Sequence, residues 1–337
     1  MRILLCSHVF APDVGGIETV SRVLAEQFSR MGSTVTVVTQ TPGLPSSTEY
    51  DVVRQPSPGN LRALARKSDL IFQSGISLRT LLPLLFCGKP IAITHHGPLA
   101  RNGRRGWQEY FKLSLLPLCH NIAISQAIAG ELPVKSTVIG DPFESQEFND
   151  PGTAAREKDI VFLGRVVPEK GCRLALHALA LLKADGLCPS FTVIGDGSEM
   201  PVLRKLSAEL GIADQVDFRG LLLHGRGCEV ARHKIMLIPS VWAEPFGLVA
   251  LEGLAAGCVL AASSDGGLPE AVGGCGLLFP NSDVPAMAAA LKRLLTDAPL
   301  RQKLLSGRDR HLERFQPQTA ARHYLVYFES VLARRSG

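Results

Sequence analysis

The sequence has no C-x-x-C pair and no other cysteine spacing typical of a zinc site or a disulfide framework, although it contains eight cysteines. Several of these cysteines lie inside apolar runs, which predicts buried, reduced thiols. No apolar segment approaches the roughly 18 uninterrupted residues of a membrane span. The apolar start of the chain ends by Phe10 without a cleavage-like site, so no signal peptide is expected. These absences predict a cytoplasmic protein.

Two further absences exclude classes of function. Without a G-x-G-x-x-G segment, the sequence has no fingerprint for a nicotinamide cofactor. Without a basic stripe or an aromatic platform along the chain, a nucleic-acid binder is not expected. The net charge of +5 is mild for 337 residues and suits a protein that meets anionic small molecules or a membrane surface.

The sequence does contain a regular alternation of strand-like and helical segments. Short apolar or β-branched runs predict strands, and apolar spacings of three and four predict helices. In the first part of the chain we expect strands at Ile3–Cys6, Thr34–Thr39, Leu70–Phe72, Ile91–Thr94 and Asn121–Ile124, with helices at Glu18–Met31, Leu61–Arg66, Leu78–Phe86 and from Ser125. This alternation predicts a parallel sheet covered by helices on both faces.

The alternation is interrupted at Asp141–Arg156, where proline, glycine, asparagine and acidic residues are typical of a linker. A second series follows, with strands at Ile160–Leu163, Phe191–Ile194, Val216–Arg219, Ile235–Ile238 and Val259–Ala262, and helices at Cys172–Ala184, Met200–Leu210, Leu248–Ala256 and Val284–Thr296. We therefore expect an α/β protein with two Rossmann-like, doubly wound parallel-sheet domains, at residues 1–145 and 156–314, facing an interdomain cleft. Residues 315–337 should form a C-terminal helix, over Pro317–Ala333.

A loop with a glycine at each end, Gly164–Gly171, follows one predicted strand and carries Arg165 and Lys170. Arginine supplies a planar fork of donors and lysine a compact charge, so both side chains can bind one diphosphate. The glycines would let a ligand approach the backbone closely. A solvated surface loop is the alternative explanation.

Two glutamates, Glu244 and Glu252, stand at the ends of the segment E-P-F-G-L-V-A-L-E. Pro245 suits the first turn of a helix, where free N–H groups can bind phosphate or hydroxyl groups. On a helix the two carboxylates would lie about 12 Å apart along the axis, comparable to a nucleotide-sugar from ribose to hexose. Alternatively, Glu244 is only a helix-terminal charge and Glu252 a surface residue, but the apolar neighbours of Glu252 disfavour a solvated face.

Weaker signals lie in the first half of the chain. Gly15 and Gly16, between a strand and a helix, can form an anion-holding loop or a plain turn. His95 and His96 follow the strand Ile91–Thr94, where a histidine can donate to a substrate hydroxyl or stabilise charge near a reacting carbon. A metal pair fits poorly, because adjacent side chains point in different directions and no carboxylate stands nearby in the sequence.

A basic and aromatic segment is a candidate for contact with a membrane or a lipid phosphate. It contains Arg101, Arg104, Arg105, Trp107 and Lys112. Basic side chains interleaved with aromatic ones can hold an anionic membrane surface. A solvated loop that leads into a helix explains the same residues equally well.

Together these segments resemble glycosyltransferase family 4, retaining enzymes of the GT-B fold that include bacterial hexosyl and mannosyl transferases of polysaccharide or glycolipid assembly. The resemblance covers nearly the whole chain. It rests on the early Gly-Gly loop, Thr94-His95-His96-Gly97, the G-R-x4-K-G loop, Ile194–Gly197, Phe218–Gly220 and, most distinctively, the E-x7-E segment from Glu244 to Glu252. At the hinge the family often has an N-G-V-D-like segment, whereas this chain has Ile139-Gly140-Asp141-Pro142-Phe143.

The resemblance implies a role for each matching residue. Arg165 and Lys170 would bind the donor diphosphate and stabilise the leaving nucleotide, Glu252 would hold the ribose hydroxyls, and Glu244 would contact the transferred sugar. Backbone groups of Phe246, Gly247, Leu248 and Val249 would face the sugar and phosphates, with Gly15 and Gly16 approaching the phosphate from the other domain. His96, with His95 as the reserve choice, would be the histidine of the cleft. The last helix would cross back onto the first domain.

The resemblance also implies the reaction: transfer of a hexose, with retention, from a UDP- or GDP-linked donor to a hydroxyl of a glycan or lipid-linked acceptor. No D-x-D motif is present, so a metal ion on the diphosphate is not suggested, and no cofactor is expected. We expect the protein to stay in the cytoplasm. The basic and aromatic segment from Arg101 to Lys112 could bring it into peripheral contact with the inner face of the membrane. The alternatives are a GT-B epimerase, synthase or phosphorylase, or a catalytically silent subunit that binds sugar nucleotides.

Overall fold

The chain divides into two compact units in the computed structural model, which describes residues 1–13, 15–43, 49–98, 106–149 and 156–336. The first unit comprises Met1–Phe143 and Arg314–Gly337, and the second comprises Glu144–Glu313. The sequence placed the end of the first domain at residue 145 and the start of the second at 156. The division instead falls after Phe143, because Glu144 and Glu147 hydrogen-bond to Arg226 of the second unit.

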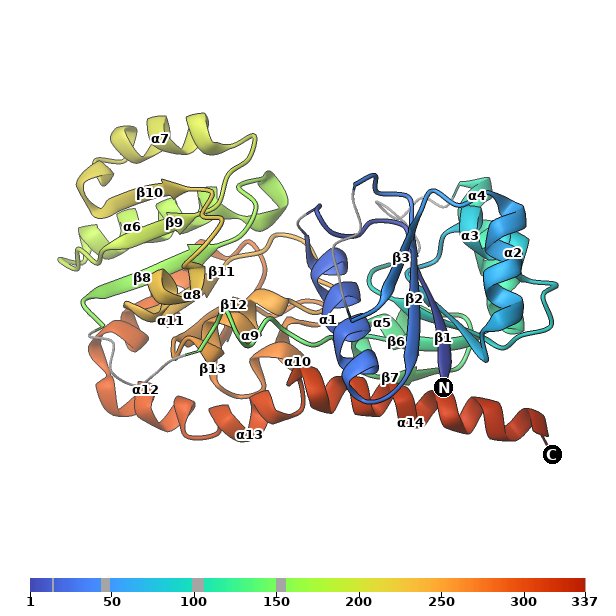
Figure 1. Cartoon of the computed structure of the whole chain (residues 1–337). Coiled ribbons are helices and arrows are strands. Elements are labelled where there is room, and N and C mark those ends of the chain that lie inside the picture. Colours follow the sequence, from blue (N-terminus) through green and yellow to red (C-terminus); the bar gives the residue numbers. More distant parts are fainter. Residues whose placement is uncertain (14, 44–48, 99–105, 150–155, 337) are drawn as a thin grey trace. The chain divides into compact units, whose positions relative to one another are not determined.

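The first unit contains one parallel sheet with helices on both faces (Figure 1). Its strands are β1 (Arg2–Ser7), β2 (Thr34–Thr39), β3 (Asp51–Arg54), β4 (Leu70–Ser74), β5 (Ile91–His95), β6 (His120–Ala123) and β7 (Ser136–Val138). Its helices are α1 (Gly16–Arg30), α2 (Pro58–Lys67), α3 (Leu78–Leu84), α4 (Trp107–Leu115), α5 (Gln126–Glu131) and α14 (Pro317–Ser336), with a short 3-10 turn at Leu116–Leu118. The strand order is β3-β2-β1-β4-β5-β6-β7, so the direction of winding reverses between β1 and β4.

One face of this sheet is covered by α2, α3 and the end of α4, whose apolar side chains pack on Leu4, Ile71 and Ile93. On the other face an aromatic cluster joins α14 to α1 and β4. Tyr324 and Phe328 of α14 lie within about 5 to 6 Å, centroid to centroid, of Phe28 and Phe72. Such contacts between buried aromatic rings bind the C-terminal helix to the first unit.

The second unit repeats the plan. Its strands are β8 (Lys158–Leu163), β9 (Phe191–Ile194), β10 (Val216–Gly220), β11 (His233–Ile238), β12 (Val259–Ser263) and β13 (Gly276–Phe279). Its helices are α6 (Cys172–Ala184), α7 (Met200–Glu209), α8 (Arg226–Ala231), α9 (Leu248–Ala255), α10 (Leu268–Val272), α11 (Val284–Thr296), α12 (Ala298–Leu305) and α13 (Arg308–Glu313), with 3-10 turns at Pro168–Lys170 and Ala213–Gln215. The parallel strands run β10-β9-β8-β11-β12-β13, so the winding reverses between β8 and β11.

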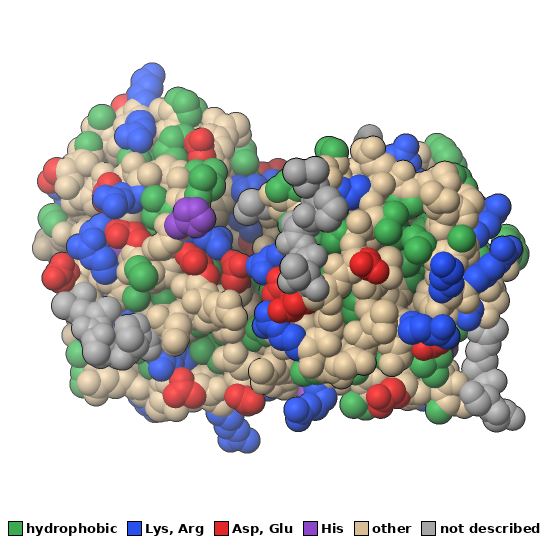
Figure 2. Space-filling view, in the orientation of Figure 1, with side chains coloured by type: hydrophobic (Ala, Val, Ile, Leu, Met, Phe, Trp, Pro, Cys, Tyr) green, Lys and Arg blue, Asp and Glu red, His purple; other side chains and the backbone are tan. Residues whose placement is uncertain are grey.

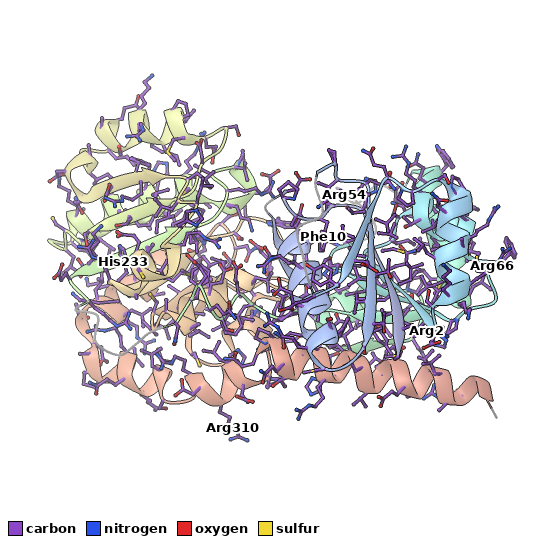
Figure 3. The ribbon with its side chains drawn as sticks, viewed as in Figure 1. Arg2, Phe10, Arg54, Arg66, His233 and Arg310 are labelled. Carbon is purple, nitrogen blue, oxygen red and sulfur yellow. The ribbon has the colours of Figure 1, made fainter. Side chains whose placement is uncertain are left out.

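The strands of this second sheet are buried, as expected for a parallel sheet covered on both faces. Side chains of α6, α7 and α11 pack on one face, against Ile160, Val193 and Leu237 among others. His233 lies inside this unit (Figure 3), where its two ring nitrogens contact the Glu229 carbonyl and the Thr192 hydroxyl. Among the described residues, no helix combines the length and the apolar character needed to cross a membrane.

Candidate functional site

The candidate site residues of the second unit lie on two loops at the point where its sheet reverses its winding. One loop, Gly164–Gly171, follows β8, and the other, Pro239–Gly247, follows β11, and these two strands are neighbours. Loops at this position of a doubly wound sheet are where such folds bind ligands. The fold therefore brings together two motifs that are far apart in the sequence.

Backbone contacts hold these two loops against each other. The amide of Val241 donates to the carbonyl of Glu169 at 2.9 Å. Gly171 has φ of +71°, and a Cβ atom at this position would collide with the carbonyl oxygen of Pro239. Glycine is thus required at residue 171 both by its backbone conformation and by the closeness of the second loop.

This double requirement predicts an unequal effect of two otherwise similar substitutions. Gly186 has φ of +81°, and a Cβ atom there would meet nothing within 4 Å. Gly186→Ala should therefore cost only about 1 kcal/mol of unfolding free energy, the strain of a left-handed residue. Gly171→Ala should cost roughly 3 kcal/mol, because the collision adds to that strain. Urea unfolding of both variants tests this difference, and equal losses would contradict the close packing of the two loops.

The central contact of the site joins Lys170 to Glu244. The Nζ atom of Lys170 donates to Oε1 of Glu244 at 2.5 Å, and the hydroxyl of Ser240 donates to the same oxygen at 2.5 Å. The Glu244 side chain is only 6% exposed, whereas that of Lys170 is 20% exposed. Oε2 of Glu244 has no hydrogen-bond partner among the described residues, so it can accept a hydrogen bond from a ligand hydroxyl.

Arg165 is exposed on the same loop as Lys170. Within the described ranges it makes no hydrogen bond and no ion pair. The loop that carries it is packed on a second glycine loop, since the amide of Val166 donates to the carbonyl of Asp196 at 2.9 Å and Gly195 lies against the backbone of Gly164. The backbone beside Arg165 is therefore fixed, while its guanidinium stays available to an anion.

The helix predicted at Leu248–Ala256 begins at Leu248 as expected, but the interpretation that Pro245 lies in its first turn is wrong. Helix α9 begins at Leu248, because Gly247 has φ of +105° and Glu244 forms a β-bridge with Gly266. The carbonyl of Glu244 also accepts from the amide of Gly267 at 2.6 Å. The separation of the two glutamates is consequently not that of one continuous helix. The free amides at the helix start belong to Leu248 and Val249, for which the described residues offer no backbone acceptor.

Glu252 lies one turn into α9 and is half-buried. Burial away from water raises the pKa of its carboxyl to about 7, with the nearby charges of Glu144 and Glu147 adding to the shift and Arg226 opposing it. No hydrogen bond or ion pair joins Glu252 to Lys170 or Glu244 in the described part of the chain. The two glutamates of the E-x7-E segment therefore have different surroundings. Glu244 is ion-paired with Lys170, whereas Glu252 lies near Arg226, which also interacts with two other glutamates.

The first unit holds the remaining predicted site residues. Gly15 precedes the first turn of α1, and Gly16 begins it. His95 is buried, with Nε2 on Oδ1 of Asn121 at 3.0 Å, and burial lowers its pKa. His96 lies beyond the end of β5, with Nδ1 on Oδ2 of Asp141 at 2.9 Å. His95 thus belongs to the interior of the sheet, and His96 lies at its edge.

Sequence reasoning missed several residues that complete these sites. Ser240 and Asp141 contact predicted residues directly, and Arg226, with Glu144 and Glu147, determines the charge around Glu252. Asp141 was noticed only as a departure at the hinge, and Ser240 could have been suspected from its place just after a buried strand. Within the described residues, no group of three or more histidine, cysteine or acidic side chains is arranged to hold a metal ion.

The region that carries these loops matches a known family. Residues 143–307 fit the family model described as Glycosyl transferases group 1. Over this segment, a little under half of its length, the chain is similar to that family. The matched segment includes both loops of the site and the whole of α9, so the glycosyl transferase motifs and the contact between Lys170 and Glu244 lie in the same domain.

Individual glycosyl transferases are similar to parts of the chain. The chain is 37% identical over 187 residues to the D-inositol 3-phosphate glycosyltransferase of Stackebrandtia nassauensis, covering 52% of this chain and 42% of that protein. It is 29% identical over 284 residues to the MMP alpha-(1->4)-mannosyltransferase of Mycolicibacterium hassiacum, covering 75% of this chain and 68% of that protein. For the first of the curated relatives, the chain spans about half of their length.

The fold matches solved structures over nearly the full chain. Anabaena Alr3699/HepE, crystallised with UDP, superimposes with a TM-score of 0.81 at 18% identity, covering 98% of this chain and 100% of that chain. This likeness establishes the GT-B fold, with its two parallel α/β sheets of seven and six strands.

Proposed function

We propose that this chain is a glycosyltransferase that moves a sugar from a nucleoside-diphosphate donor to a hydroxyl acceptor. The observation that carries the proposal is the Lys170–Glu244 pair, placed beside the exposed Arg165 where the second sheet reverses its winding. Two cations and a carboxylate with one free oxygen match a diphosphate next to a sugar hydroxyl. The glycosyltransferase names of the matched relatives support the same class of reaction.

The finer proposal is hexose transfer with retention of configuration, from a UDP- or GDP-linked donor to a glycan or lipid-linked acceptor. The family resemblance supports retention, and Anabaena Alr3699/HepE has been crystallised with UDP-glucose. In the proposed step the bond from the anomeric carbon to the phosphate oxygen breaks, and a bond to the acceptor oxygen forms on the same face. The acceptor proton passes to the leaving phosphate, so no enzymic nucleophile is required.

Electrostatic stabilisation of the leaving diphosphate is the main contribution that we propose for this chain. Arg165, Lys170 and the free amides at the start of α9 would bind the negative charge that develops on the phosphate. Because the protein supplies the positive charge that stabilises the phosphate, we propose that transfer needs no metal ion. Glu244, already held by Lys170 and Ser240, would receive a sugar hydroxyl on its other carboxylate oxygen.

Transfer kinetics of two arginine variants test the proposal. Arg165→Ala should lower kcat/KM about 100- to 1000-fold, as expected for loss of a donor to the charge of the transition state. Arg293→Ala, an exposed arginine on α11, is the matched control and should leave transfer unchanged. Wild-type rates in both Arg165→Ala and Glu244→Ala, with folding intact, would overturn the assignment. Loss of activity with a chelator would overturn its metal-free part alone.

Donor identity and the rival activities need separate measurements. A thermal-shift screen against UDP- and GDP-sugars should identify the donor, since a ligand that binds only the folded state raises the melting temperature. Incubation with donor but no acceptor distinguishes an epimerase, which would still form an epimerised product. A silent subunit would bind a donor without transferring its sugar to any acceptor.

We also propose that the protein is cytoplasmic and contacts the inner face of the membrane through the start of α4. Trp107 and Tyr110 of this helix are 74% and 62% exposed, with Lys112 on the same helix. Arg101, Arg104 and Arg105 lie outside the described residues. Basic side chains gather along the edge of the first unit near α2, where Arg66 points outward (Figures 2 and 3). Co-sedimentation with anionic vesicles, but not with neutral ones, should depend on Trp107 and Tyr110.

A further inference from the structure

A chain of three buried serines crosses the first sheet at the point where its winding reverses. Ser7 ends β1 and Ser74 ends β4, and the two residues are register partners. Ser21 of α1 lies between them, with its Oγ 3.0 Å from that of Ser7 and 2.8 Å from that of Ser74. All three side chains are buried, so each hydroxyl depends on the protein for its hydrogen bonds.

The serine chain ends on His96. Oγ of Ser74 lies 3.1 Å from Nε2 of His96, and Nδ1 on the other side of the ring lies 2.9 Å from Oδ2 of Asp141. The side chains of His96 and Asp141 are each only 5% exposed. Both nitrogens of the imidazole are therefore occupied, and the ring is held from both sides.

The available protons give this chain a direction. The hydroxyl of Ser21 donates its one proton to Ser74. The hydroxyl of Ser7 donates to the carbonyl of Val9 at 2.6 Å, so its 3.0 Å contact with Ser21 has no proton between the two oxygens. The proton of Ser74 is then free to be donated to Nε2 of His96. A ring that accepts at Nε2 while neutral carries its proton on Nδ1, which faces the carboxylate of Asp141. The whole chain is consistent with one tautomer.

Ser74, His96 and Asp141 are hydrogen-bonded in the same order as the serine, histidine and aspartate of a hydrolase triad. However, Ser74 is not placed as a nucleophile. Its side chain is 3% exposed, and its oxygen already accepts a hydrogen bond from Ser21. A nucleophilic oxygen has to reach the reacting carbon, which a buried, hydrogen-bonded hydroxyl cannot do. Ser74 and Asp141 therefore orient the histidine, and the serine itself does not react.

We propose that Asp141 and Ser74 are positioning residues that fix His96 as the Nδ1–H tautomer, with Nε2 as a hydrogen-bond acceptor. The inference rests on the proposed function for the role of His96 at the transferred sugar. The sequence predicted that His96 donates a hydrogen bond to a substrate hydroxyl. In this tautomer the direction is reversed: a substrate hydroxyl that replaces Ser74 at Nε2 has to donate to the ring. The inference also gives a purpose to Asp141, whose second oxygen has no partner among the described residues.

Nitrogen-15 NMR of histidine-labelled protein tests the tautomer directly. The His96 signals are assigned by their loss in His96→Gln. Wild-type protein should show a protonated Nδ1 and an unprotonated Nε2. Asp141→Asn should change this pattern, because an amide group can donate to Nδ1. Asp69→Asn is the control, since Asp69 pairs with Arg2 in the same unit and should leave the His96 signals unchanged. A protonated Nε2 of His96 in the wild type would overturn the proposal, whether or not Asp141→Asn folds.

Kinetics then separate positioning from general stability. Asp141→Asn should lower kcat about 10- to 100-fold, the usual cost of losing the partner that orients a functional histidine, with the donor KM within about twofold. Asp69→Asn should leave both constants unchanged. An unchanged kcat, or an unchanged tautomer in folded Asp141→Asn, would contradict the inference. If the wild type transfers no sugar, the proposed function fails, whereas the tautomer measurement still decides the role of Asp141.

Discussion

Lys170→Met is expected to lower sugar transfer about 100- to 1000-fold, because it removes one of the two cations that would stabilise the departing diphosphate. Methionine keeps the apolar stem and removes only the charged end. The substitution also leaves the Glu244 carboxylate, 6% exposed, without its ion pair and with only the Ser240 hydroxyl on Oε1. We expect a loss of about 2 to 3 kcal/mol in the free energy of unfolding, since removing one partner of a buried pair leaves an uncompensated charge.

A double variant separates the two effects. In Lys170→Met/Glu244→Gln the buried charge is gone, so the free energy of unfolding should return most of the way to the wild-type value. Sugar transfer should stay low. Lys292→Met, which breaks an ion pair with Asp185 whose side chains are 49% and 55% exposed, is the control. It should change stability by no more than about 0.5 kcal/mol and leave transfer unchanged. Recovery of transfer in the double variant would show that Lys170 acts only on Glu244 and not on the donor.

Glu252→Gln is expected to stabilise the protein at alkaline pH while weakening donor binding. The folded protein raises the pKa of this carboxyl to about 7 from 4.5, mainly by burial. Below pH 4.5 the group is protonated in both folded and unfolded states and contributes nothing. As the pH rises to 7 the unfolded state ionises first, so the wild type loses about 2 to 3 kcal/mol over this window. Glutamine cannot ionise and removes this loss.

Urea unfolding at pH 5 and pH 8 measures the effect. The difference in unfolding free energy between the two pH values should be smaller in Glu252→Gln than in the wild type by about 2 kcal/mol. Glu209→Gln, at an exposed glutamate of α7, should keep the wild-type difference. Calorimetric titration with the donor should show weaker binding by Glu252→Gln, about tenfold, if Glu252 holds the ribose hydroxyls. An identical pH dependence in all three proteins would rule out a raised pKa at Glu252.

Elements in the middle of each sheet were predictable from the sequence, whereas of the edge strands only β10 was predicted. Four predicted elements have the limits found in the structure: Thr34–Thr39, Cys172–Ala184, Phe191–Ile194 and Val284–Thr296. The strands β3, β7 and β13, which the sequence did not reveal, are all at sheet edges. An edge strand pairs on one side only and is less buried, so its sequence need not be a continuous apolar run. The apolar pattern is therefore weakest where the missing strands lie.

The sequence by itself predicted Arg165, Lys170, Glu244 and Glu252 as site residues, because each is a charged residue on a glycine-bearing loop or in an apolar helical segment. It could not show that Glu244 and Pro245 lie outside α9, because Glu244 forms a bridge with Gly266, a residue distant in the sequence. Contacts of this kind join residues distant in the chain, and no local pattern records them.

Tertiary structure alone decided which partners these residues have. The pairing of Lys170 with Glu244, and of His96 with Asp141 and Ser74, follows from the order of parallel strands. Neighbouring strands in each sheet come from separate parts of the sequence, and their carboxyl ends meet at one edge. Local sequence determined which side chains could do the chemistry; the winding of the two sheets determined which of them share a proton or a charge.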